Sequence, residues 1–231
     1  MRVNDVVLVP SLGRPASDFN QLADSLSSAG FTPHLMDPVP QWDGKPTLHD
    51  LADEVVSRLD SLGVDRFHLI GHAFGNRLSR CITADYNTRV ESLTLLAAGG
   101  LVEPEEHIWV ALAECFNSEL SQEEHLQYVS TAFFAPGNDA SVWVDGWFPQ
   151  MMQYQRAAVI RTPREDWWPA NVDKVLVIQG LNDAIAPVEN GRRYKSESAP
   201  HAQLVEINNA GHALLPEQPE AIAQAVLQFL G

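Results

Sequence analysis

The sequence contains little cysteine, no long apolar run and few positive charges. Cys81 and Cys115 are its only cysteines, too few for a disulfide framework or a zinc site. No stretch approaches the roughly 20 apolar residues that a membrane-spanning helix needs. Lysine and arginine number 15 against 30 aspartates and glutamates, and the net charge of −15 disfavours nucleic acid and anionic membranes as partners. The first residues lack a signal-peptide pattern, so we expect a cytoplasmic protein.

Short apolar runs alternate with helical patterns along most of the 231 residues. The run from Val6 to Val9 is β-branched and wholly apolar, as is typical of a strand buried on both faces of a sheet. The expected strands cover 6–9, 32–36, 67–70, 90–96, 175–178 and 204–207. Strands separated by amphipathic helices pair in parallel through right-handed crossovers. The order therefore predicts the α/β class, with a doubly wound, mostly parallel sheet of about six strands.

The long segment between the fourth and fifth expected strands has helical patterns and many aromatic residues, including five of the six tryptophans. We expect residues 100–168 to form a helical cap, inserted after the fourth strand of a core made of residues 1–99 and 169–231. Each aromatic residue alone is readily explained by packing, but the set predicts an apolar ligand cavity under the cap. The residues expected to line this cavity are Trp109, Phe133, Phe134, Trp143, Trp147 and Met151.

The stretch Gly71-His72-Ala73-Phe74-Gly75 lies between the third expected strand and a helical pattern. A strand, a sharp turn and a helix with small residues at both ends of the turn are what Gly-x-Ser-x-Gly needs to expose a serine above a parallel sheet. The serine position holds Ala73, which has no nucleophilic atom. We expect this residue to have a positive φ, and we expect His72 to be a structural neighbour.

An acid and a histidine follow the last two expected strands. Asp183 lies on a loop that begins at Gly180, and His212 follows a turn at Gly211. The chain order of nucleophile position, acid and histidine is therefore 73, 183, 212, which is the order found in hydrolases with this kind of sheet. Glu103, just past the fourth strand, is an alternative acid.

With these three segments in place, the chain resembles the α/β-hydrolase superfamily over essentially its whole length. The resemblance implies a Ser-Asp-His triad without a metal or organic cofactor, a cap, and a sheet of six strands in place of the usual eight. It also implies that the backbone amides of Leu12 and Phe74 form the oxyanion hole, with Ser11 beside them. The reaction implied for an intact site is acyl transfer from a serine ester to water.

Alanine at position 73 leaves several functions open. Strain at this position, with the acid and histidine retained, favours an engineered Ser→Ala substitution over a natural loss of catalysis. The leading prediction is a hydrolase that acts on an ester or lactone of a mid-sized apolar substrate and is silenced by this replacement. The alternatives are a C–C hydrolase or lyase with the same triad, an enzyme with aspartate at 73, and a non-catalytic small-molecule receptor. A monomer and a homodimer are both compatible with the sequence.

Overall fold

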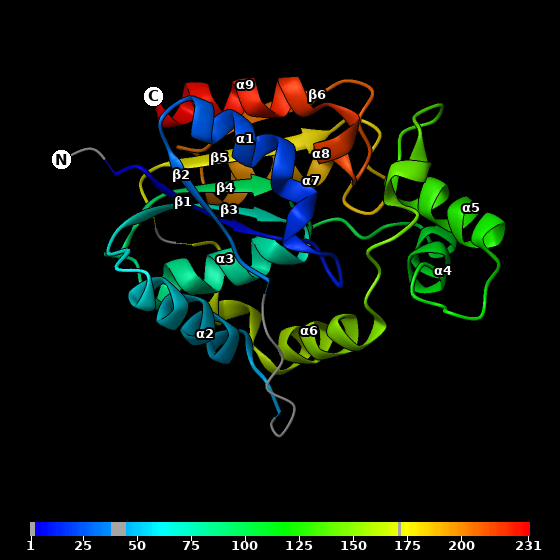
Figure 1. Cartoon of the computed structure of the whole chain (residues 1–231), viewed down its shortest axis with the longest axis horizontal. Helices are drawn as coiled ribbons and strands as arrows, with labels where there is room; N and C mark the ends of the chain where they lie inside the picture. Colours follow the sequence, from blue (N-terminus) through cyan, green and yellow to red (C-terminus); the bar gives the residue numbers. More distant parts are fainter. Residues whose placement is uncertain (1–2, 38–44, 171) are drawn as a thin grey trace.

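The computed structural model describes residues 3–37, 45–170 and 172–231, and its six strands form one parallel sheet (Figure 1). The strand order is β2-β1-β3-β4-β5-β6, and every neighbouring pair is parallel. The strands are β1 Asp5–Val9, β2 Thr32–Leu35, β3 Phe67–His72, β4 Val90–Leu96, β5 Val175–Gly180 and β6 Gln203–Ile207. The predicted fold class is confirmed.

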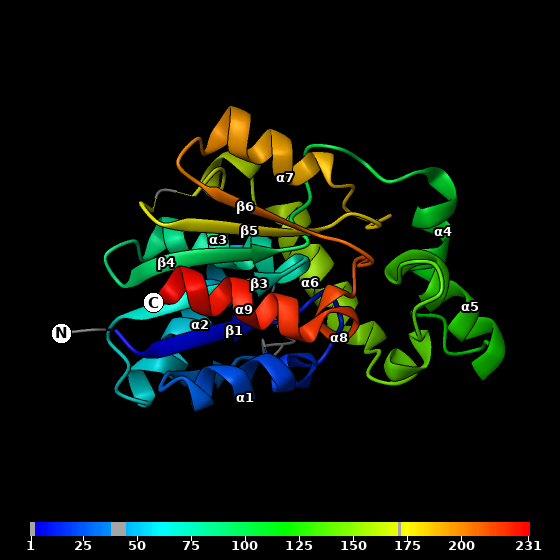
Figure 2. The same cartoon turned by 90° about the horizontal axis from the view of Figure 1, so that it is seen from above.

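Helices cover both faces of the sheet, which explains why the central strands are almost wholly buried. One core cluster joins the sheet to α2 and α3, and a second joins the opposite face to α1 and α9 (Figure 2). All six residues of β3 and of β5 are buried. The helices of this part are α1 Asn20–Ser28, α2 Leu48–Ser61, α3 Phe74–Asp85, α7 Glu189–Arg193, α8 Leu214–Glu217 and α9 Pro219–Leu230, with short helical turns at Ala16–Phe19 and Tyr194–Ser198.

The segment between β4 and β5 is helical, and no strand occurs among its described residues. It contains α4 Glu106–Glu114, α5 Gln122–Phe133, α6 Pro149–Arg161 and the turns η2 Ala140–Trp143 and η3 Arg164–Asp166. Figures 1 and 2 show α4 and α5 beyond the carboxyl ends of the strands, whereas α6 returns beside α2. The division into a core and a cap at 100–168 stays a prediction. None of the helices in the described part is both long and apolar enough to cross a membrane.

Candidate active site at the carboxyl ends of the strands

Ala73 forms the sharp connection between β3 and α3. Its φ of 52° and ψ of −104° lie outside the regions that residues with a β-carbon favour, so the expected positive φ is present. The two glycines around it allow close approach of the backbone. A β-carbon on Gly75 would collide with the carbonyl oxygen of Val9, and one on Gly71 would collide with the carbonyl of Gly75. The turn therefore presents residue 73 at the end of the sheet because strand and helix pass almost in contact.

His212 and Asp183 meet above the same end of the sheet. The Nδ1 atom of His212 lies 3.0 and 2.9 Å from the two carboxylate oxygens of Asp183, and both side chains are buried. The backbone amides of Ile185 and Ala186 donate to the Oδ1 atom of Asp183 at 3.0 and 2.7 Å, which holds the carboxylate in place. An ionised carboxylate can only accept, so Nδ1 carries the proton and Nε2 is the basic nitrogen of the neutral ring.

His72 contacts the backbone of His212. Its Nε2 atom donates a hydrogen bond of 2.7 Å to the backbone carbonyl of His212, and its ring is fully buried. Burial lowers the pKa of His72 to about 3, with a further contribution from the neighbouring His212. His72 is therefore neutral near pH 7 and fixes the position of the His212 backbone.

The loop after β1 lies across the cavity from His212. Ser11 is almost fully buried, and the backbone amides of Leu12 and Phe74 donate to no acceptor among the described residues. The next residue, Gly13, is tied to the α6 region twice. Its amide donates to the Gln155 Oε1 atom at 2.7 Å, and its carbonyl accepts from the amide of Phe148 at 3.0 Å.

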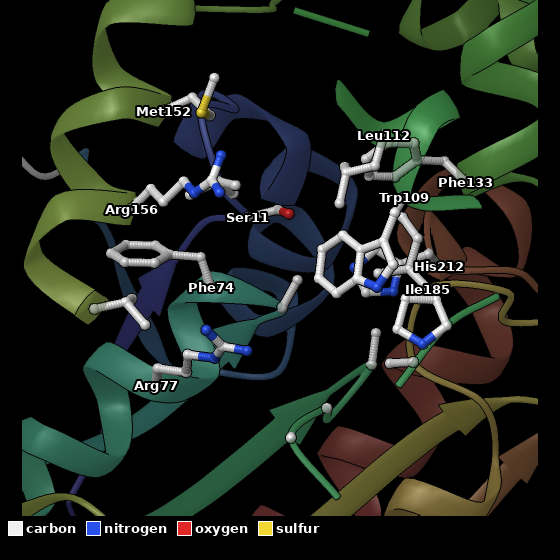
Figure 3. A pocket seen from close by; sticks show the side chains of 18 of the residues that line it. Ser11, Phe74, Arg77, Trp109, Leu112, Phe133, Met152, Arg156, Ile185 and His212 are labelled. Atoms are coloured by element: carbon white, nitrogen blue, oxygen red, sulfur yellow. The ribbon is translucent and has the colours of Figure 1, made fainter. Parts of the chain in front are cut away.

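These elements surround a cavity of about 630 Å³ (Figure 3). Ala73 and His212 line it together with Leu12 and Phe74, so the proposed nucleophile position, base and oxyanion amides share one cavity. Glu103 lines the wall, but Asp183 is the carboxylate that hydrogen-bonds to His212. Of the aromatic and polar residues predicted to contact substrate, those in the lining are Ser11, Trp109 and Phe133.

The other predicted substrate contacts, Phe134, Trp143, Trp147 and Met151, are outside the lining of this cavity. The two tryptophan rings stack on the guanidinium of Arg14, with centroids 4.2 and 4.6 Å from its central carbon. Phe134 packs edge-on against Trp143. Composition alone could not separate these packing residues from the lining, because both sets lie in the same aromatic segment.

Sequence reasoning missed two arginines in the cavity wall, Arg77 on α3 and Arg156 on α6. A signal for the first was present, because residues four apart lie on one face of a helix and Arg77 follows Ala73 by four. For Arg156 the sequence offers no comparable signal. The wall also contains Leu112, Phe116 and Met152, so it is apolar with a positively charged part.

One group of side chains outside the cavity has the donor types of a metal site. Ligand atoms of His49, Cys81 and Asp85 all lie within 4.8 Å of one another. Nδ1 of His49 hydrogen-bonds to Asp85 at 2.7 Å and Nε2 to Asp166 at 3.3 Å, so both ring nitrogens already have partners. The group joins α2 to α3 and contributes nothing to the cavity lining.

Comparisons with known proteins bear on the fold and the family of this chain. Residues 6–225 match the family described as "Alpha/beta hydrolase family". A relative named "Putative carbamate hydrolase RutD", from Caulobacter sp. (strain K31), is 25% identical over 201 residues, covering 80% of this chain and 72% of the relative. A 2-hydroxy-6-oxononadienedioate/2-hydroxy-6-oxononatrienedioate hydrolase from Pseudomonas sp is 22% identical over 233 residues, covering 93% and 82%. The solved structure of naproxen esterase (carboxylesterase NP) from Bacillus subtilis superposes with a TM-score of 0.73 at 20% identity, covering 99% and 84%.

Proposed function

This chain belongs to the alpha/beta hydrolase family, and we propose that its cavity is the site of a carboxylic-ester or lactone hydrolase of the Ser-His-Asp type. In this proposal, position 73 is the nucleophile position, and alanine there silences the reaction. The observation that supports it most is the retention of a hydrogen-bonded His212–Asp183 pair in one cavity with Ala73 at a strained turn. A cytoplasmic location and a small-molecule substrate are part of the same proposal.

Each group would have a defined task with serine at position 73. The serine oxygen would attack the carbonyl carbon while the Nε2 atom of His212 takes its proton. Asp183 would stabilise the imidazolium, and the amides of Leu12 and Phe74 would stabilise the negative charge on the carbonyl oxygen. The alcohol would leave with the proton from His212. A water deprotonated by His212 would then attack the acyl group and release the acid and the serine.

Strain at Ala73 supports the interpretation that alanine replaced a nucleophile. A residue with a β-carbon at this φ costs about 1 to 3 kcal/mol, which a chain without catalytic need has no reason to retain. The hydrogen bonds that hold Asp183 and His212 in register are also intact. Both observations support the proposal that alanine at position 73 stands where a catalytic serine would complete the site.

Hydrolysis of short p-nitrophenyl esters and a small lactone panel by the unchanged chain and by Ala73→Ser tests the proposal. We expect Ala73→Ser to raise turnover by at least about a thousandfold, because the serine is the only missing member of the site. The double variant Ala73→Ser/His212→Ala should lose this gain. Equal activity of Ala73→Ser and the double variant would contradict the proposal.

Two other functions remain to be separated by the same variants. The Pseudomonas relative is named as a hydrolase of 2-hydroxy-6-oxo dienoic and trienoic diacids, which favours C–C hydrolysis as a second candidate function. In that case Ala73→Ser would turn over such a diacid and would not turn over simple esters. If Ala73→Ser turns over nothing, Ala73→Asp tests for an aspartate nucleophile. Ligand binding without turnover by both variants would support a receptor.

A further inference from the structure

We propose that Arg77 and Arg156 form a subsite for a carboxylate group at the end of the cavity away from His212. The proposal rests on the proposed function in that the ester or lactone would carry this second, anionic group. It replaces the expectation of a purely apolar substrate with an amphipathic acid: an apolar body, a scissile carbonyl near His212 and a carboxylate at the arginines.

Both arginine side chains point into the cavity. Arg77 is on the first turns of α3, four residues after Ala73, and Arg156 is on α6 (Figure 3). In this view the two side chains reach in from the side opposite His212, with Phe74 between them. A ligand that spans the cavity would therefore meet the arginines at one end and the imidazole at the other.

Neither guanidinium is paired directly with a carboxylate, by an ion pair or a hydrogen bond, in the described part of the chain. Glu103, also in the lining, attracts Arg77 only from beyond ion-pair distance, and Arg164 repels it. Two cations thus face the cavity of a protein that has 30 acidic side chains to pair with them.

Arg14 is a buried arginine with a structural role, and its guanidinium is paired with acceptors from the protein. Its guanidinium hydrogen-bonds to both carboxylate oxygens of Asp18 and to the carbonyl of Asp145. Arg77 is mostly shielded from water too, and burial lowers its pKa, but its side chain faces the cavity and has no hydrogen-bond acceptor among residues 3–37, 45–170 and 172–231. A carboxylate matches the geometry of a guanidinium and can accept two parallel hydrogen bonds from it.

Binding to the unchanged chain tests the subsite, because alanine at position 73 leaves the ligand intact. The probes are monomethyl suberate, which carries one carboxylate, and dimethyl suberate, which is neutral and nearly the same size. Affinities come from isothermal titration calorimetry. We expect the half-ester to bind at least about tenfold more tightly than the diester, which is the gain of a charge-assisted bidentate pair in a shielded site.

The variants Arg77→Gln and Arg156→Gln assign the effect to the two residues. Arg77→Gln should weaken binding of the half-ester about tenfold and leave binding of the diester almost unchanged. Because Arg156 is more exposed than Arg77, Arg156→Gln should weaken binding of the half-ester only about threefold. Arg161→Gln is the matched control, since Arg161 is exposed at the end of α6, lies outside the cavity lining and carries the same charge. It should change neither affinity. Arg156→Gln on the exposed helix face keeps the test informative if Arg77→Gln does not fold.

Two results would overturn the subsite: equal affinity for the half-ester and the diester, or equal losses in Arg77→Gln and Arg161→Gln. The hydrolase proposal is tested separately by turnover of the same two esters by Ala73→Ser. Half-ester selectivity without turnover would keep the anionic subsite and refute the hydrolase. Turnover of both esters at equal kcat/KM, without selectivity in binding, would keep the hydrolase and refute the subsite.

Discussion

Two buried arginines lie against tryptophans in this molecule, and they are stabilised in opposite ways. Arg14, after β1, is bound by Asp18 and stacks on Trp143 and Trp147. Arg80, on α3, is fully buried and has no carboxylate partner in the described part of the chain; the hydroxyl of Tyr194 is its polar neighbour.

The Arg80 guanidinium faces aromatic rings instead, with centroids of Trp168 at 4.5 Å and of Tyr194 at 4.8 Å. Burial lowers the pKa of Arg80 to about 10. The two arginines hold different parts of the segment between β4 and β5: the Arg14 junction holds the η2 region, and the Arg80 junction holds the return to β5. One junction thus satisfies its cation with hydrogen bonds, whereas the other surrounds it with ring faces. They should therefore respond differently when the charge is removed.

The largest expected effect is at the Arg14 junction. Arg14→Met removes the partner of the buried Asp18 carboxylate, and an uncompensated buried charge typically costs about 3 to 5 kcal/mol of stability. Urea unfolding of the parent and the variant measures the loss. Arg58→Met, which breaks a partly exposed pair with Glu54, is the control and should cost about 1 kcal/mol or less. A similar loss in both variants would mean that the Asp18 pair is no stronger than a surface pair.

Arg80→Met should have a much smaller effect. The variant forfeits cation–π attraction of about 1 to 2 kcal/mol, but it also removes a buried charge that lacks a carboxylate partner among the described residues. Methionine has a similar length and can fill the aromatic surroundings. We expect stability within about 1 kcal/mol of the parent in the same urea experiment. A loss as large as that of Arg14→Met would show that ring faces hold a buried cation as firmly as a carboxylate does.

Acid should weaken the Arg14 junction through His72, whose ring lies 6.2 Å from that of Trp143. The pKa of His72 is about 3 in the fold and near 6.5 when unfolded, so below pH 6.5 the unfolded chain binds the extra proton. The contribution of His72 to the free energy of unfolding therefore decreases as the pH is lowered, by about 1.4 kcal/mol per pH unit below 6.5. Stabilities of the parent and His72→Gln at pH 7.0 and 5.5 isolate this contribution. An identical pH dependence in both proteins would exclude His72 as its source.

The smallest effect has the opposite sign and lies near the Arg80 junction. Hydrogen bonds that the His49 ring donates to the carboxylates of Asp85 and Asp166, the first having the larger effect, raise the pKa of His49 in the fold. The resulting stability is complete below pH 6.5 and is lost as pH rises through the raised folded pKa. Because these side chains are partly exposed, it amounts to at most about 0.5 kcal/mol. The Tm difference between parent and His49→Gln should be present at pH 6 and absent at pH 9. A Tm difference that grows toward pH 9 would contradict this prediction, because it would mean that the fold lowers the pKa of His49.

The sequence predicted most where the signal is local. The alternation of short strand-like runs with helical patterns located the six strands, and turns with glycine located Ala73, Asp183 and His212, because strand ends in a parallel sheet converge on one edge. The cavity wall was harder, since it depends on how distant helices pack. Trp143 and Trp147 satisfy Arg14 rather than the cavity, and this pairing spans about 130 residues of sequence. Arg156 lines the cavity only because of where α6 packs, and the sequence does not reveal that position.

The two hydrogen bonds of Gly13 have a mechanical consequence. Because Gln155 and Phe148 hold this glycine from both sides of its backbone, the loop that carries the Leu12 amide is coupled to the start of α6. An outward displacement of α6 would therefore also displace that amide, so the position of α6 and the geometry around position 73 depend on each other.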